Sequence, residues 1–188
     1  VRLNISGTTL TVTPLAAKYT NANWLSDLTQ FDTDGTGTSI AVSDASGGYG
    51  VYNLKFAGAL SSAYAIPANT VVQMGSNTGG QANLRPVLDD QFGPGVVMNF
   101  VNASGQWMRF DLMGTSQTLA GLNAGTTATQ AGAVIQNQDV HHTVPFGDAT
   151  LTLNGSGTYV YHGYIRDADN GTTTRKLHLV KDGSGSQT

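Results

Sequence analysis

Short runs in which hydrophobic and polar residues alternate recur along most of this chain. In the segment 107–112, for example, Met108, Phe110 and Leu112 occupy every second position. Because successive side chains of a β-strand point to opposite faces, a period of two predicts strands. The same pattern predicts strands at 2–5, 9–12, 39–42, 51–56, 96–100, 133–135, 151–153, 159–161 and 177–179. Gly, Asn, Asp and Ser between the runs predict turns.

One segment has a helical pattern instead. Residues 23–31 (NWLSDLTQF) place Trp24, Leu28 and Phe31 on one stripe at helical spacing. We therefore expect at most one short helix, and Trp24 would pack it onto one end of the fold as a cap. The segment 81–94 shows no periodicity and is expected to be a loop.

Many short strands build either an antiparallel sandwich or barrel, or a parallel β-helix in which strands stack turn upon turn. Frequent Asn and Gly between the runs favour the parallel β-helix, whose corners need unusual backbone angles. Thr and Ser on the outward positions suit its sides. The expected fold class is therefore all-β, a β-solenoid with irregular turns, since no strict repeat emerges from the first part of the chain.

Composition narrows the function classes. The chain has 188 residues, of which 39% are hydrophobic and only 11% charged, against a usual share of roughly a quarter. The hydrophobic share is large enough to form a core. The chain has 24 Gly and no Cys, and the absence of Cys excludes thiolate and disulfide chemistry. A formal net charge of −3 leaves no basic surface for nucleic acid. No apolar stretch is long enough to span a membrane. We expect one domain over residues 1–188, excised from a longer secreted protein.

Three segments near the C-terminus carry a recognisable pattern. They read QAGAVIQN at 130–137, ATLTLNGSGTYVYHGYIRD at 149–167 and KLHLVKDGSGSQT at 176–188. Together they resemble the autotransporter-associated β-strand repeat, a module of large bacterial surface and secreted proteins, and the resemblance covers residues 117–188. It implies a right-handed parallel β-helix and a secreted or cell-surface location in a bacterium. Solenoids of this kind serve as stalks, adhesins and glycan-binding modules, so the resemblance leaves the function open.

Alternation also selects candidate ligand contacts. If Ile165 faces the core, then His162, Tyr164 and Arg166 form a row on the outer surface. If Met108, Phe110 and Leu112 face the core, then Trp107, Arg109 and Asp111 project outward in the same way. An aromatic ring packs against a sugar face while charged and amide groups take its hydroxyls. These six residues are the predicted ligand-binding set, and the alternative for Trp107 is burial under the segment 81–94.

Metal and catalytic signals are few. Asp32 and Asp34 offer oxygen ligands of the kind that calcium takes, but the rest of a calcium loop is missing, and His141 and His142 are adjacent in a strand-like or loop context. No cofactor is expected apart from a structural calcium ion. Nucleophile and phosphate-loop motifs are absent from the sequence. Asp89, Asp90 and Asp111, with Arg85 and Arg109 near them, are the acids that a β-helical glycoside hydrolase or polysaccharide lyase would use.

These observations lead to one hypothesis and two alternatives. The chain is expected to be a non-catalytic carbohydrate-binding module that recognises a neutral plant cell-wall polysaccharide, such as xylan, by aromatic stacking and hydroxyl hydrogen bonds. Its weak charge favours a neutral glycan over a polyanion. A structural passenger segment of a bacterial adhesin and a glycan-cleaving enzyme remain the alternatives.

Overall fold

The computed structural model describes the backbone of residues 2–6, 9–13, 39–42, 49–54 and 81–82. It describes backbone and side chains of residues 64, 66, 68–74, 83–86, 88–101, 107–125, 132–138, 147–168 and 174–188. Every helix or strand within these ranges is a strand, which confirms the all-β prediction. The helix predicted at 23–31 lies outside the described residues.

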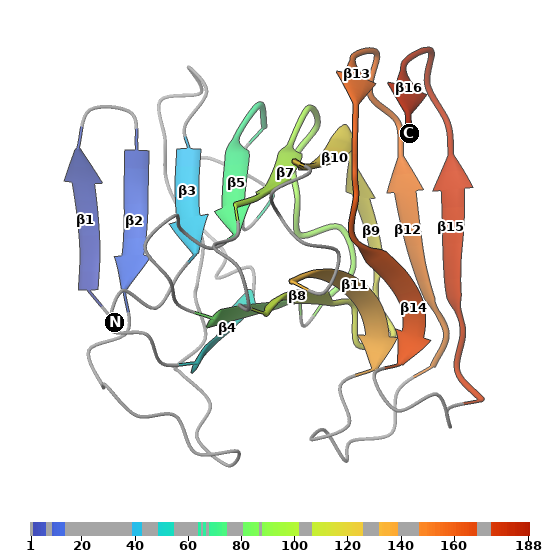
Figure 1. The fold of residues 1–188 in the computed structure, drawn as a ribbon, viewed down its shortest axis with the longest axis horizontal. Coiled ribbons are helices and arrows are strands. Elements are labelled where there is room, and N and C mark those ends of the chain that lie inside the picture. Colours follow the sequence, from blue (N-terminus) through green and yellow to red (C-terminus); the bar gives the residue numbers. More distant parts are fainter. Residues whose placement is uncertain are drawn as a thin grey trace.

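Three sheets form the body of the protein (Figure 1). The first sheet contains β1 (Arg2–Ser6), β2 (Thr9–Thr13), β3 (Ser39–Val42), β5 (Val71–Met74), β7 (Val97–Phe100) and β10 (Gly121–Ala124). The second contains β4 (Tyr49–Leu54), β6 (Gln81–Pro86), β8 (Met108–Asp111), β11 (Ala133–Gln138) and β14 (Tyr164–Ala168). The third contains β9 (Ser116–Leu119), β12 (Ala149–Leu153) and β15 (Leu177–Lys181), while β13 (Thr158–Tyr159) pairs with β16 (Ser186–Gln187).

The chain visits the three sheets in rotation. After β7 in the first sheet come β8 in the second and β9 in the third, and the next turn repeats this order with β10, β11 and β12. Each of these later strands pairs in parallel with its counterpart one turn earlier. This arrangement is a parallel β-solenoid, as predicted. Its right-handed sense stays a prediction, favoured because parallel crossovers are almost always right-handed.

One strand pair departs from the parallel pattern. β1 runs antiparallel to β2, with Leu3 opposite Val12 and Ile5 opposite Leu10. Only two residues separate these strands in the sequence, and such a short connection joins antiparallel strands but not parallel ones. Parallel pairing begins between β2 and β3.

Hydrophobic residues of successive turns stack in register to form the core. In the second sheet Leu84, Phe110 and Ile135 are aligned and at most 1% exposed. Comparable buried columns in the other sheets contain Val72, Met98 and Leu122, and Leu119 and Leu153. Each such side chain contributes about 1.5–3 kcal/mol by its burial. The alternation in the sequence thus becomes a set of continuous apolar columns along the solenoid.

Two details of the predicted strands are corrected. Residues 81–94, expected to be a loop, contain β6 in the second sheet, where the polar Asn83 and Arg85 are themselves buried. Residues 158–167, in which strand alternation placed His162, Tyr164 and Arg166 in one row, belong to two strands, β13 and β14, with a corner between them. At this corner a Cβ on Gly163 would lie 2.3 Å from the carbonyl oxygen of Ala133, so the close approach of the two turns requires glycine.

Candidate functional site

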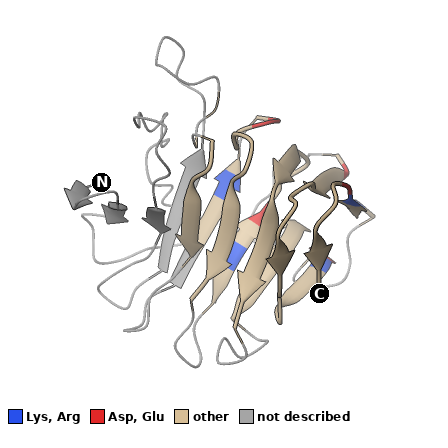
Figure 2. Cartoon of the chain, turned by 90° about the horizontal axis from the view of Figure 1, so that it is seen from above, with Lys and Arg blue, Asp and Glu red and all other residues tan. Residues whose placement is uncertain are grey.

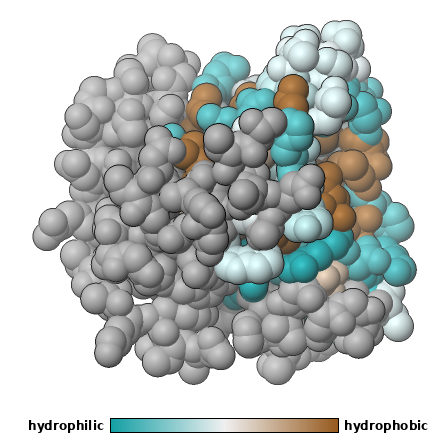
Figure 3. Space-filling model, viewed as in Figure 1, coloured by the Kyte–Doolittle hydropathy of each residue, from teal (hydrophilic) through white to brown (hydrophobic). Residues whose placement is uncertain are grey.

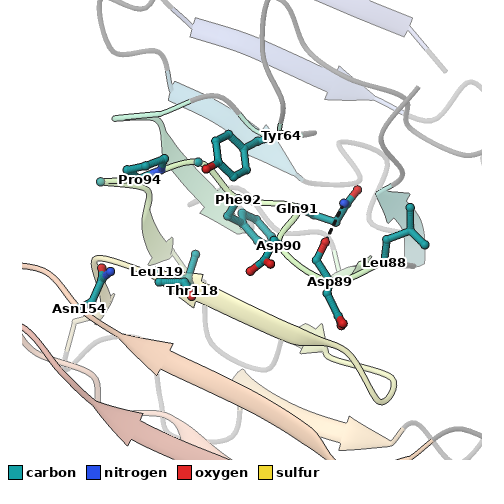
Figure 4. A pocket seen from close by; sticks show the side chains of 12 residues that line it. Tyr64, Leu88, Asp89, Asp90, Gln91, Phe92, Pro94, Thr118, Leu119 and Asn154 are labelled. Atoms are coloured by element: carbon teal, nitrogen blue, oxygen red, sulfur yellow. Dashed lines mark hydrogen bonds between the residues drawn. The ribbon is translucent and has the colours of Figure 1, made fainter. Parts of the chain in front are cut away.

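A hollow of about 590 Å³ opens beside the third sheet. Its side-chain lining comes from residues far apart in the sequence, as Figure 4 shows. The polar and aromatic side chains in this lining include those of Tyr64, Asp89, Asp90, Gln91, Thr118 and Asn154. The volume lies within the range of known small-ligand sites.

The turn that carries Asp89, Asp90 and Gln91 is held by the strand of the next level. Asp89 Oδ1 accepts a hydrogen bond from the Ser116 amide at 2.7 Å, and the Asp90 amide donates to the Ser116 carbonyl at 3.0 Å. Charge-assisted bonds of this kind are among the stronger ones. The turn is therefore fixed relative to β9.

Gln117 completes this support from inside the solenoid. It is aligned with the core residue Leu151 yet carries an amide, which is 1% exposed. Its Oε1 accepts from the Gln91 backbone amide at 2.9 Å, and its Nε2 donates to the Leu88 backbone carbonyl at 2.7 Å. The Gln117 side chain thus supplies hydrogen-bond partners to the backbone of the turn 88–91, which is not part of a strand.

One acceptor in the hollow is open to a ligand, and a second lies buried beside it. The Asp90 carboxylate is exposed and neither accepts a hydrogen bond nor forms an ion pair with any described residue. Asp90 also has a positive φ of 52°, a region that Asp tolerates better than most residues. Gln91 is 3% exposed, and its Oε1 has no donor among the described atoms, although its Nε2 donates to the Asp89 carbonyl at 3.1 Å.

The rest of the lining supplies an aromatic ring and neutral polar groups. Tyr64 is half-buried on one side, and Thr118 and Asn154 lie on the other (Figure 4). Phe92 forms the floor and packs edge-on against the core residue Phe110, with ring centroids 5.5 Å apart. The described lining contains two carboxylates and no Lys or Arg, so its electrostatic character is acidic.

The predicted set Trp107, Arg109 and Asp111 lies at β8, and the structure confirms that its neighbours Met108, Phe110 and Leu112 are fully buried. Trp107 and Arg109 are half-buried, with the guanidinium carbon 5.4 Å from the indole ring centroid. This contact is a cation–π interaction.

The expected exposure of Asp111 is corrected. The residue is 0% exposed, and its Oδ2 accepts from Arg85 Nε at 3.0 Å, with Arg85 itself 3% exposed. A buried carboxylate needs such a partner because burial of an unpaired charge is costly. In this structure Asp111 is a structural ion-pair partner on the second sheet, where Figure 2 shows acidic and basic positions on neighbouring strands.

The second predicted set joins the first on the same sheet. Through β11, Tyr164 aligns with Arg109, and Arg166 aligns with Asp111. Arg166 Nε donates to Gln136 Oε1 at 2.9 Å, and Tyr164 is 47% exposed. His162 precedes β14 at the corner, so it is exposed but stands outside the row that Tyr164 and Arg166 form.

The metal candidates Asp32, Asp34, His141 and His142 lie outside the described residues. Within the described ranges, no group of three or more His, Cys, Asp or Glu side chains is placed to hold a metal ion. In the same ranges there is no helix with the length and apolar character needed to cross a bilayer.

Comparisons with known proteins add no relative. No protein-family profile, no curated protein and no solved structure matches the chain. The fold therefore defines the class, a parallel β-solenoid, and only the chemistry of the site bears on function.

Sequence reasoning named part of the hollow and missed the rest. Asp89 and Asp90 stood out in the sequence as candidate acids. Thr118, Asn154 and Gln91 gave no signal, because residues of these types are common in turns and strands. They meet only because the turns of the solenoid stack, which is a property of register.

Proposed function

We propose that this protein is a non-catalytic carbohydrate-binding module, and that it holds a neutral plant cell-wall polysaccharide of the xylan type in the hollow. The observation that carries the proposal is that the Tyr64 ring and the Asp90 carboxylate, which has no partner among the described residues, share one hollow of suitable size. A sugar ring presents a C–H face for stacking and hydroxyls at its edge. The two groups match these two features.

The donor and acceptor balance supports a sugar as ligand. The exposed Asp90 carboxylate has no donor among the described residues, and a carboxylate accepts from two hydroxyls at once. The acidic lining disfavours polyanions.

The proposal is for binding and not for cleavage. Of the two carboxylates in the hollow, Asp89 holds the Ser116 amide, and the third candidate acid, Asp111, pairs with Arg85 in the interior. Glycoside hydrolysis requires two carboxyl groups that face one scissile bond. The described geometry offers Asp90 alone for such a role.

Affinity electrophoresis and calorimetry on a panel of xylan, other neutral glycans and polygalacturonate test the proposal. We expect retardation on neutral glycan and a loss of about tenfold or more in affinity for Tyr64→Ala and for Asp90→Asn, a change of about 1.4 kcal/mol. No binding to any glycan would contradict the function.

Tyr164→Ala is the matched control, since Tyr164 is an exposed tyrosine on the second sheet. We expect it to bind as the unchanged protein does. If Tyr164→Ala loses binding while Tyr64→Ala keeps it, the ligand lies on the second sheet with Arg109 and Arg166, and the hollow is not the site.

A further inference from the structure

The hollow runs along the solenoid axis across successive turns. Ile66, two residues after Tyr64, bridges in parallel to Phe92, so Tyr64 belongs to the level before the turn of Asp90. That turn bonds to Ser116 at the start of β9, which carries Thr118. The Asn154 backbone amide, one level further, donates to the Leu119 backbone carbonyl at 2.9 Å. Tyr64, Asp90, Thr118 and Asn154 therefore stand on four successive levels.

The spacing of levels sets the length of this groove. Adjacent strands lie about 4.8 Å apart, so the three steps from Tyr64 to Asn154 cover roughly 14 Å. This is longer than one sugar ring and matches a short run of linked sugars. The polar groups are distributed along the whole length, with the ring at one end and the amide at the other (Figure 4).

At the Asn154 end, the residue that aligns with Asn154 on the next level is Asp182. The next level turns at Gly183, which has a φ of 70° and passes so close that a Cβ there would lie 2.2 Å from the Asn154 carbonyl oxygen. Only glycine fits this position. A chain that follows the groove past Asn154 therefore meets the exposed carboxylate of Asp182, whose Oδ1 accepts from the Gly183 amide at 2.8 Å.

We propose that the glycan crosses the four levels of the solenoid, and that the groove holds an internal stretch of a linear chain. This inference rests on the proposed function and specifies its ligand. One sugar stacks on Tyr64, the hydroxyls of the next bond to Asp90, and those of a further sugar bond to Thr118 and Asn154. A single sugar or a chain end uses only part of these contacts.

A length series of one linear neutral oligosaccharide tests the inference by calorimetry. We expect the affinity to rise by about tenfold or more from the disaccharide to the tetrasaccharide, and to stay level for the hexasaccharide and the polymer. Reduction of the terminal sugar is expected to leave the hexasaccharide affinity unchanged. Equal affinity for the monosaccharide and the tetrasaccharide, or loss of binding on reduction of the terminus, would overturn the inference.

Two variants separate this inference from the proposed function. Asp90→Asn is expected to weaken every oligomer, whereas Asn154→Ala weakens the tetrasaccharide but not the disaccharide. Ser156→Ala, at an exposed position two residues further on, is the control and is expected to change neither. If Asn154→Ala alters no ligand while Asp90→Asn alters all, the path across the four levels is wrong and the binding function stands. If no oligomer binds, the function itself fails.

Discussion

The Arg85–Asp111 pair shows how one polar contact decides the position of a strand. Both side chains are nearly inaccessible, and they come from adjacent strands 26 residues apart in the sequence. Alternation in 107–112 placed Asp111 correctly on the face opposite the core column. Its burial was not predictable, because it depends on β6, a segment whose polar residues conceal its strand.

Removing one partner of this pair is expected to destabilise the protein strongly. Asp111→Ala leaves the Arg85 guanidinium buried without that carboxylate, which costs about 3–5 kcal/mol. Replacing both residues, as in Arg85→Met with Asp111→Leu, removes the uncompensated charge and is expected to cost less than the single change. Urea denaturation of the three proteins gives the comparison.

The control uses an exposed ion pair. Lys176 and Asp167 lie 2.8 Å apart with 55% and 35% of their side chains exposed, so Asp167→Asn is expected to change global stability far less than Asp111→Ala. A double variant as unstable as Asp111→Ala would show that packing and not charge compensation sets the cost.

At the scale of single elements, strands with hydrophobic alternation were predictable and those without it were not. β8 was predictable because Phe110 lies two positions from the apolar Met108 and Leu112, and β12 because Leu151 lies two positions from Leu153. β6 was missed because two of its buried residues, Asn83 and Arg85, are polar and only Leu84 between them is apolar. The corner at Gly163 was missed because tyrosines on both sides of it continue the strand pattern.

β15 offers a prediction about pH, because two carboxylates anchor its start. Asp148 accepts from the Lys176 amide at 2.8 Å, and this bond, with the His178 side chain, holds its pKa below the ordinary 3.8. Asp167 accepts from the Lys176 ammonium and from the Leu177 amide, and both bonds lower its pKa. The Asp167 carboxylate in turn raises the pKa of Lys176.

A carboxylate with a lowered folded-state pKa stabilises the fold above its unfolded pKa, and this contribution is lost as the pH falls through the folded value. The anchorage of β15 is therefore expected to be complete at neutral pH and to weaken below about 3.8. NMR titration of the Lys176 and Leu177 amides measures it. Asp148→Asn with Asp167→Asn is expected to remove this pH dependence, while Asp182→Asn keeps it. An unchanged profile in the double variant would refute the anchoring role.

At the scale of the whole molecule, the solenoid was predictable as a class but not as a register. The step between aligned residues is 26 from Ala82 to Met108, 25 from Met108 to Ala133 and 30 from Val134 to Tyr164. Loops of different length between turns erase any fixed period, so the sequence shows no repeat over most of its length. The groove depends on this register, which is why Thr118 and Asn154 could not be placed beside Tyr64 in advance.

The same stacking predicts that two aligned leucines of neighbouring turns contribute very unequally to the free energy of unfolding. Leu151 and Leu179 are aligned on adjacent strands, but Leu151 is fully buried and Leu179 is 49% exposed. Exposed apolar side chains gather at this end, at the right of Figure 3, and include Ile165 and Val180. In a solenoid each turn is covered by its neighbours, and among the described strands β15 pairs with β12 alone, so its side chains are less buried.

Leu151→Ala is therefore expected to lower the free energy of unfolding by about 2–5 kcal/mol, since it opens a cavity inside the stack. Leu179→Ala is expected to cost less than about 1 kcal/mol, because its side chain already contacts water. Urea denaturation at several protein concentrations measures both. Equal losses would mean that Leu179 is covered in solution, and a loss that grows with protein concentration would assign that cover to a second molecule of the same chain.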